Sequence, residues 1–260
     1  MVHAVTLATT LRDLHHADEP LLLPNVWDAA SAKAAEGAGF PALATTSMSV
    51  ALSLGYADNE AAPADEMFAA VARISRAVSV PVTADIEAGY GLAADEVVDR
   101  LLSAGAVGCN LEDSDHGGAG MVDATAQADR LAAVRAAAEA AGVPIVINAR
   151  VDSFVPRHQV EDRLGEALRR GRDYLAAGAD AVFPIFAATE PDISALVEGL
   201  PAPVNIAYIP AGLPLPATPG LAGLANLGVR RVSFGGGLHA AAERALHSAL
   251  TAIRQGENPY

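Results

Sequence analysis

The chain has 260 residues, and 52% of them are hydrophobic, which is enough for the core of a single domain of barrel size. Its formal net charge of −14 argues against nucleic acid and membrane surfaces as partners, because both carry negative charge. The one cysteine, Cys109, excludes an intrachain disulfide and suits a cytoplasmic location. We expect neither a signal peptide after Met1 nor a membrane-spanning segment, since no apolar run is long enough.

A leading helix is expected within residues 1–20, and short apolar segments then alternate with helical ones. Glycine follows most of the helical segments, as is usual where a helix ends in a left-handed cap. The apolar segments are typical of parallel strands buried on both faces. The expected strands are Leu21–Val26, Ala42–Thr46, Val80–Ile86, Val107–Glu112, Pro144–Val151, Ala181–Pro184, Pro203–Ala207 and Arg231–Gly235. The expected helices are Asp28–Glu36, Ala64–Val78, Ala93–Ala104, Ala124–Ala141, Gln159–Ala177, Glu190–Gly199, Leu221–Leu227 and Leu238–Arg254.

Eight alternating strand–helix units predict an α/β fold, a (β/α)8 TIM barrel formed as a single domain by residues 1–260. A doubly wound open sheet is the alternative. In a barrel the active site lies at the carboxyl ends of the strands. The only lysine, Lys33, falls in a helical segment, so chemistry through a lysine Schiff base is not expected.

Three consecutive strands carry polar residues at their carboxyl ends. Asp85 and Glu87 are two residues apart and so share a face of the third strand, where their charges repel unless a cation or proton lies between them. Glu112 ends the fourth strand, and Asn148 and Arg150 share a face of the fifth. Carboxylates with few histidines favour Mg²⁺, with Mn²⁺ as an alternative, over zinc. An arginine beside the ion could bind a carboxylate or phosphonate.

Several motifs occur in order along the chain and together resemble the isocitrate lyase/phosphoenolpyruvate mutase superfamily over about residues 18–250. They are Pro24-Asn25-Val26-Trp27-Asp28-Ala29-Ala30-Ser31, Thr45-Thr46-Ser47, Gly55-Tyr56-Ala57-Asp58, Asp85-Ile86-Glu87-Ala88-Gly89-Tyr90-Gly91, Asn110-Leu111-Glu112-Asp113, Asn148-Ala149-Arg150-Val151-Asp152 and Arg231-Val232-Ser233-Phe234-Gly235. The resemblance implies a Mg²⁺-dependent barrel that acts on small anionic 2-oxo or 2-hydroxy acids. It also implies a homo-oligomer, a dimer or a tetramer, in which residues 238–254 form a last barrel helix that is exchanged between subunits.

The resemblance also implies roles for individual residues. Asp85 would be the main metal ligand, Glu87 and Glu112 would hold metal-bound waters, and Asp58 would approach the metal from a loop. Arg150 would bind the substrate carboxylate. The residues expected to contact substrate are Trp27, Thr45, Thr46, Ser47, Asp85, Asn148, Arg150 and Asn205. Among these, Trp27 would line the pocket, and the backbone N–H groups of Thr46 and Ser47 would receive oxygens of the pyruvate unit.

The chain departs from the family in the loop that selects the reaction. Lyases of the family carry a lysine–x–cysteine–glycine–histidine loop after the Glu-Asp pair, and mutases carry an Asn-Ser pair, whereas residues 114–120 contain neither. Cys109 cannot replace the missing cysteine, because it points away from the face of Glu112. His116 could act as an acid or base near neutral pH, although a solvated loop histidine is the simpler interpretation. The expected catalytic set is therefore Arg150, Glu112, Asp58 and His116.

These observations favour a Mg²⁺-dependent lyase that cleaves a C–C bond of a 2-oxo or 2-hydroxy acid, or decarboxylates it, through a metal-stabilised enolate. Two alternatives stay open. One is a phosphonopyruvate hydrolase or phosphonomutase acting on a C–P bond, and the other is a relative that binds a 2-oxo acid without turning it over. Residues 235–237 are three glycines that could cradle a phosphate, although a tight turn between strand and helix is the simpler explanation.

Overall fold

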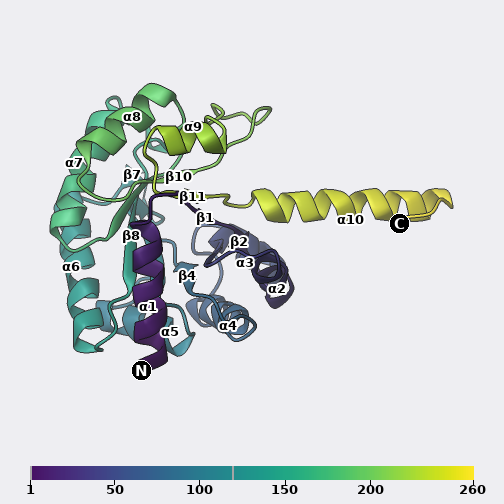
Figure 1. The fold of residues 1–260 in the computed structure, drawn as a ribbon, viewed down its shortest axis with the longest axis horizontal. Helices are drawn as coiled ribbons and strands as arrows, with labels where there is room; N and C mark the ends of the chain where they lie inside the picture. The colour runs from purple at the N-terminus through teal and green to yellow at the C-terminus, as the bar shows by residue number, and fades with distance from the viewer. Residues whose placement is uncertain (1, 119) are drawn as a thin grey trace.

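The computed structural model describes residues 2–118 and 120–260, so Met1 and Ala119, and with them one residue of the loop at 114–120, lie outside it. The described residues form a ring of parallel strands with helices around it (Figure 1). One sheet contains, in spatial order, β2 (Asn25–Val26), β3 (Leu43–Thr45), β4 (Val82–Asp85), β5 (Gly108–Glu112), β8 (Val146–Val151) and β9 (Ala181–Pro184). The other contains β1 (Leu21–Leu23), β11 (Arg231–Ser233) and β10 (Asn205–Ala207).

The two sheets join at both ends and so close the barrel. β1 and β2 are one strand interrupted at Pro24, which has no N–H to donate. At the other junction a parallel bridge pairs Val182 of β9 with Val204, and the N–H of Val182 donates to the carbonyl of Pro203 at 3.1 Å. The predicted barrel is therefore confirmed.

Helices follow the strands as predicted, with small shifts at their ends. They are α2 (Ala29–Gly37), α4 (Ala64–Ser75), α5 (Ala94–Ser103), α6 (Ala124–Ala140), α7 (Arg163–Ala176), α8 (Glu190–Gly199) and α9 (Leu221–Asn226). The largest shift is at α7, expected from Gln159. Its N-cap is Asp162, whose side chain accepts a hydrogen bond from the N–H of Gly165, whereas Gln159 has a left-handed φ of 52°.

The leading helix α1 (Val2–His15) packs against the end of the barrel at which the strands begin. Leu11 is fully buried there, and a Cβ added to Gly108 at the start of β5 would lie 2.9 Å from its side chain. His15, also on α1, lies 3.3 Å from the guanidinium of Arg231 inside the barrel. Gly108 and the buried Arg231 therefore position α1 against the barrel.

Three local elements were not predicted. The helix α3 (Ser47–Leu54) follows β3 directly, and its N-terminus meets the carboxylate of Asp85. The segment after β5 forms a short antiparallel hairpin of β6 (Ser114–Asp115) and β7 (Gly120–Met121). A single turn of 3₁₀ helix, η1 (Pro156–His158), follows β8. All three lie beyond the carboxyl ends of strands, where the site is expected.

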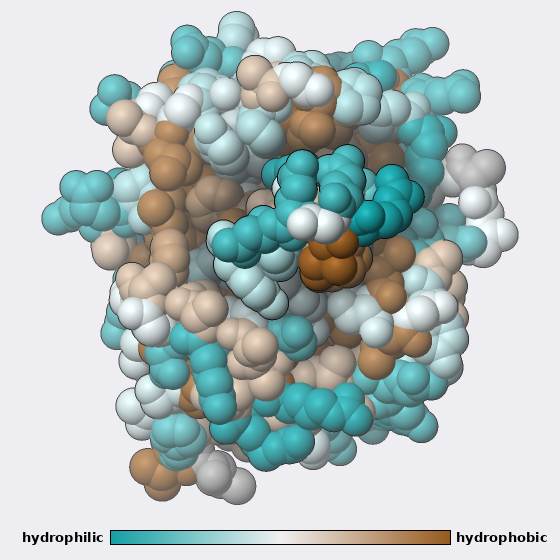
Figure 2. Space-filling view, turned by 90° about the vertical axis from the view of Figure 1, so that its right-hand side faces the viewer, coloured by the Kyte–Doolittle hydropathy of each residue, from teal (hydrophilic) through white to brown (hydrophobic). Residues whose placement is uncertain are grey.

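The last helix, α10 (Gly237–Gln255), projects from the barrel instead of covering it (Figure 1). None of its residues is buried, and Leu246, Leu250 and Ile253 on one face of it are exposed. Figure 2 views the molecule from the side on which α10 projects, and hydrophobic and hydrophilic residues lie next to each other on the helix. None of the helices in the described part of the chain is both long and apolar enough to span a membrane.

Candidate active site

A cavity of about 240 Å³ opens at the carboxyl ends of the strands. The polar residues that line it include Thr46, Ser47, Asp58, Asp85, Arg150 and Arg157. The apolar ones include Val155, Phe183, Ile185 and Phe186. The cavity thus offers charged groups to a ligand, together with apolar surface that limits the access of water.

Asp85, at the end of β4, is held in one orientation. Its Oδ2 accepts hydrogen bonds from the N–H of Ser47 at 3.1 Å and from the Ser47 hydroxyl at 2.8 Å, and its own N–H donates to the Thr45 hydroxyl. The N-terminal end of α3 also favours a negative charge here. Asp85 Oδ1 is buried and has no hydrogen-bond partner among the described residues. A buried carboxylate oxygen without a donor is costly unless a cation or a ligand reaches it.

Glu87 links two loops at the rim. Its Oε2 accepts from the N–H of Glu60 at 2.6 Å, its Oε1 accepts from the Tyr90 hydroxyl at 3.1 Å, and Glu60 Oε1 accepts from the N–H of Tyr90. Both Glu60 and Glu87 have left-handed φ values, 58° and 50°, which are unusual for residues with side chains. Burial, with repulsion from Asp85 and Asp58, raises the pKa of Glu87 to about 7.

Arg150, at the end of β8, lies between two buried carboxylates. Its Nε and Nη2 donate to Asp152 at 2.7 and 2.9 Å, and its Nη1 pairs with Glu112. A guanidinium has five N–H groups, so two remain for a ligand in the cavity. The pairing also explains how Glu112 and Asp152 can be buried together.

His116 lies in the β6–β7 hairpin and reaches Glu112 from outside the cavity. Its Nε2 is 2.8 Å from Glu112 Oε1, an ion-pair contact without the alignment of a hydrogen bond. Contact with Glu112 raises the pKa of His116, and burial raises the pKa of Glu112. The pair therefore keeps a shared proton to a higher pH than either group would alone.

Arg157, on η1, is a residue that the sequence analysis missed. It lines the cavity and donates to Asn59 Oδ1 at 2.9 Å and to the Ser114 hydroxyl at 3.0 Å. It forms no ion pair with any described residue, unlike Arg150. Its position directly after β8, at the end of the barrel that carries the site, was the available signal.

Several predicted contacts lie elsewhere. Asn148 and Asn205 are fully buried deeper in the barrel, where Asn148 donates to Asn110 at 2.8 Å and Asn205 donates to Ser233 at 3.4 Å. Thr45 positions Asp85 through its hydroxyl instead of lining the cavity. These residues shape the site from below.

Trp27 lies in a different place from the one expected. It lines an apolar groove with Phe40 and Leu238, and its ring meets the ring of His239 edge-on at 4.9 Å. The N-terminal end of α10 occupies the space beside Trp27. This could not be predicted, because the sequence does not give the position of α10. Trp27 thus lines this groove, and its contact with substrate stays a prediction.

Backbone N–H groups at two places beside the site already have protein partners. The N–H of Thr46 donates to the carbonyl of Val26 at 3.3 Å, and that of Ser47 is taken by Asp85, so neither is free for substrate oxygens. The N–H groups of Phe234 and Gly235 both donate to Asn25 Oδ1, at 2.7 and 3.0 Å. The glycines at 235–237 thus form a tight turn anchored by Asn25 and not an open phosphate cradle.

The donor set fits a magnesium ion held mainly by Asp85. In residues 2–118 and 120–260, no three His, Cys, Asp or Glu side chains are grouped so as to hold a metal by themselves. Mg²⁺ does not require such a group, because it keeps several waters and takes one or two protein carboxylates. Glu87 and Glu112 already use both carboxylate oxygens on protein partners, so contact through water suits them.

Comparison with known proteins agrees with this fold. Residues 11–254 match the model of the phosphoenolpyruvate phosphomutase family. An uncharacterized protein of Mycobacterium tuberculosis is 32% identical, over 95% of this chain and 90% of its own length. An oxaloacetate decarboxylase of Rhodopseudomonas palustris is 30% identical, over 90% of this chain and 80% of its own. A crystal structure of a candidate phosphonomutase from Burkholderia cenocepacia is 40% identical with a TM-score of 0.86, covering 94% of this chain and 99% of that one.

The barrel and its acidic rim define a class of α/β enzymes with the site at the strand ends. The chain belongs to the isocitrate lyase/phosphoenolpyruvate mutase superfamily, whose members include lyases and mutases. The family resemblance inferred from the motifs is therefore confirmed.

The raised pKa of Glu87 predicts how stability of the metal-free protein depends on pH. Below about pH 4, Glu87 is protonated in both folded and unfolded states; between about pH 4.5 and about 7 only the unfolded chain releases the proton readily. The free energy of unfolding should therefore fall across this window, and Glu87→Gln should remove part of the fall. Denaturant unfolding in EDTA at several pH values measures it.

Asp113, whose burial raises its pKa to about 6, contributes in the same direction, so the difference between variant and parent carries the test. Glu139→Gln, an exposed site on α6, is the matched control and should follow the parent. Identical pH dependence of Glu87→Gln and the parent would contradict a proton on Glu87.

Proposed function

We propose that the protein is a Mg²⁺-dependent lyase that cleaves a C–C bond of a small 2-oxo or 2-hydroxy acid, or decarboxylates it. One observation carries the proposal: a carboxylate oxygen of Asp85 without a donor and two unused N–H groups of Arg150 belong to one cavity. A cation and a carboxylate are the ligands that such groups bind. The relative from Rhodopseudomonas palustris, which is named an oxaloacetate decarboxylase, supports this class of reaction.

The protein groups divide the work. Asp85 would hold Mg²⁺ directly, with Glu87 and Glu112 through waters, and the ion would supply a Lewis acid that withdraws charge from the oxygens of the acid. Arg150 fixes the substrate carboxylate, since Asp152 and Glu112 hold its guanidinium in place. The apolar residues that line the cavity limit the access of water to the reacting carbon. The pair of His116 and Glu112 would supply a proton by way of a water, because neither residue lines the cavity.

Removal of the Asp85 charge tests the metal assignment. Asp85→Asn should lower kcat/KM by at least about a hundredfold, because a Lewis acid contributes several kcal/mol to such reactions. Release of pyruvate, glyoxylate or CO₂ from a panel of 2-oxo and 2-hydroxy acids at saturating Mg²⁺ measures this. Calorimetric binding of oxalate should also lose its dependence on Mg²⁺.

Asp95→Asn, at an exposed position on α5, removes the same charge away from the site and should leave both quantities unchanged. Unchanged oxalate affinity of Asp85→Asn would refute the metal assignment. Tight oxalate binding by the parent without turnover of any acid would identify a binding protein in place of a lyase.

Arg157 extends the proposal to the second charge of the substrate. Two carboxylates already flank Arg150, whereas the contacts of Arg157 to Asn59 and Ser114 are with neutral oxygens. Its positive charge at the cavity wall is therefore available to an anion. We infer that it binds the distal carboxylate of a dicarboxylic acid.

Arg157→Met should lower kcat/KM for a dicarboxylic 2-oxo acid such as oxaloacetate by about 10- to 100-fold, the value of one charge-assisted hydrogen bond. Binding of pyruvate, which has one carboxylate, should change little. Arg163→Met, at an exposed arginine outside this cavity, is the control. Equal losses for both acids would mean that Arg157 only tethers the loop of Asn59.

A reaction at a C–P bond is the second candidate, and the 40% identity to the candidate phosphonomutase from Burkholderia cenocepacia favours it. The same cavity would hold phosphonopyruvate, whose phosphonate offers oxygens to an arginine as a carboxylate does. Phosphorus NMR of phosphonopyruvate with enzyme and Mg²⁺ separates the candidates. Loss of the phosphonate signal would replace C–C cleavage by C–P chemistry.

We further propose that a second copy of this chain covers α10. The helix buries none of its residues. An apolar groove of about 360 Å³, lined by Trp27, Phe40 and Leu238, lies beside its N-terminal end. A helix of this length with an exposed apolar face is marginal by itself in water. Exchange of the helix between two copies would bury both the helix and the groove.

The double variant Leu246→Glu, Leu250→Glu places charges on that face and should shift the protein to monomers in sedimentation equilibrium. Ser248→Glu is the matched control, because two residues along a helix turn the side chain by about 200° to the opposite side. A parent protein that is monomeric at micromolar concentration would refute the exchange.

A further inference from the structure

Phe186 stands in a turn where the backbone favours glycine. β9 ends at Pro184, and the N–H of Ala187 donates back to the carbonyl of Pro184 at 3.1 Å, which closes a four-residue turn. Phe186 is the third residue of this turn and has a φ of +66°. Glycine adopts that conformation without strain, whereas a phenylalanine is a genuine outlier there. The strain indicates that the ring serves a purpose at this position.

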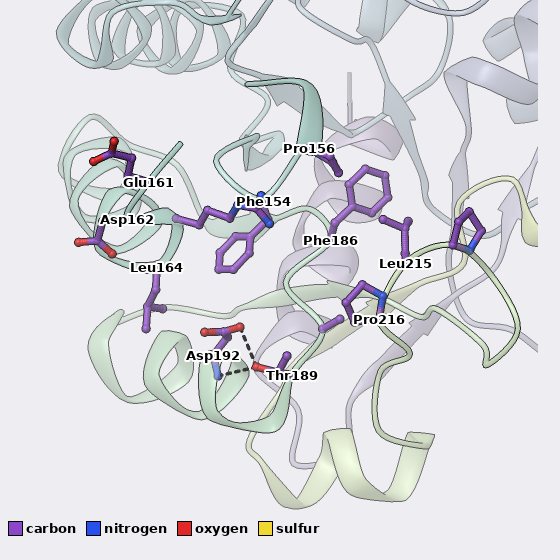
Figure 3. Close-up of a pocket in the computed structure, with 13 residues that line it drawn as sticks. Phe154, Pro156, Glu161, Asp162, Leu164, Phe186, Thr189, Asp192, Leu215 and Pro216 are labelled. Atoms are coloured by element: carbon purple, nitrogen blue, oxygen red, sulfur yellow. Dashed lines mark hydrogen bonds between the residues drawn. The ribbon is translucent and has the colours of Figure 1, made fainter. Parts of the chain in front are cut away.

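The ring of Phe186 lies between two cavities. It lines the catalytic cavity, as Val155 and Ile185 also do. It also lines a second cavity of about 470 Å³, which lies over the loops after β8, β9 and β10. Figure 3 shows this second cavity, with Phe186 close to Pro156 and Leu215. Phe186 is thus a partition between the catalytic cavity and a larger space.

The second cavity contains apolar surface that an aliphatic group could contact. Phe154, Leu164 and Leu215 contribute this surface. Three of its polar side chains cap helices: Asp162 accepts from the N–H of Gly165, and Thr189 is paired with Asp192, the pair joined by dashed lines in Figure 3. Glu161 and Arg163 line the cavity as well.

Phe186 lines the same cavity as Asp85 and Arg150, the groups that would bind the charged head of an acid. The carbon chain of an acid bound there through its carboxylate and 2-oxo oxygens has to fit the rest of this cavity. The length of that carbon chain is limited by whatever closes the cavity.

We propose that Phe186 sets the length of the aliphatic arm that the enzyme accepts, by closing the catalytic cavity against the second one. The proposal rests on the proposed function in one respect, the 2-oxo acid head group. With the ring in place the enzyme is restricted to short acids. Without the ring the two cavities become one, and a longer arm gains the apolar surface around Phe154 and Leu215.

Two substitutions of Phe186 distinguish the effect of the aromatic ring from the effect of backbone strain. Phe186→Gly removes both, whereas Phe186→Ala removes the ring and keeps a side chain in the left-handed conformation. Thermal unfolding should therefore give a higher Tm for the glycine variant than for the alanine variant. If the ring served only to pack the fold, both variants would lose stability without a change in ligand preference.

The probe is a pair of 2-oxo acid analogues, oxamate and N-hexyloxamate, titrated calorimetrically into the full chain with Mg²⁺. The parent should prefer oxamate. Phe186→Gly should prefer N-hexyloxamate by at least about tenfold, since each buried methylene can contribute up to about fourfold in affinity. Phe186→Ala should shift in the same direction. Leu215→Ala, which enlarges only the second cavity, should keep the preference of the parent.

The outcomes that overturn the proposal are distinct. An unchanged preference in both Phe186 variants, or a parent that already prefers N-hexyloxamate, overturns the partition and leaves the proposed function intact. Failure of the parent to bind oxamate at all overturns the head-group site, and both proposals fall with it.

Discussion

Mutual repulsion of carboxylates at one end of the barrel is the constraint on which the site depends. Asp85, Glu87, Glu112 and Asp152 converge there, and the last three are almost completely buried. Arg150 compensates Glu112 and Asp152, which leaves the charges of Asp85 and Glu87 to a cation or to protons. A proton suffices on Glu87, whereas Asp85, fixed by Ser47, keeps an oxygen without any donor. The arrangement of these carboxylates therefore supports the proposed cation site.

Below this acidic rim the barrel interior is polar but nearly neutral. Asn110 accepts hydrogen bonds from both Asn148 and Arg231, so a chain of amides connects the buried guanidinium to the strands of the site. Burial lowers the pKa of Arg231 to about 10, against the opposing field of Asp85. The positive charge of Arg231 lies on the side of Asp85 away from solvent. There it attracts the negative charge of Asp85 and so offsets part of the repulsion among the carboxylates. The residues expected to touch substrate, Asn148 and Asn205, belong to this supporting layer.

The sequence predicted those parts of the molecule that depend on local patterns. Short apolar segments and glycine-capped helices predicted the barrel, and strand periodicity placed Asp85 and Arg150 on one rim. Contacts between distant segments could not be predicted in this way. Arg157 reaches the cavity because η1 forms between Asn59 and Ser114, and Trp27 faces a groove because α10 leaves the barrel. Phe186 was missed because its φ follows from the turn and not from any residue pattern.

The hydrogen bond between Glu87 and Glu60 links the ionisation of Glu87 to the stability of the loop at 58–60. It is a backbone N–H to carboxylate bond at 2.6 Å, and such a bond is stronger when the carboxylate is ionised. A cation that keeps Glu87 ionised therefore also tightens the loop that carries Asp58. Linkage makes this coupling reciprocal, so an ordered loop raises the affinity for the cation by the same factor. Affinity for the proposed cation and order in the loop at 58–60 are in this sense coupled to one another.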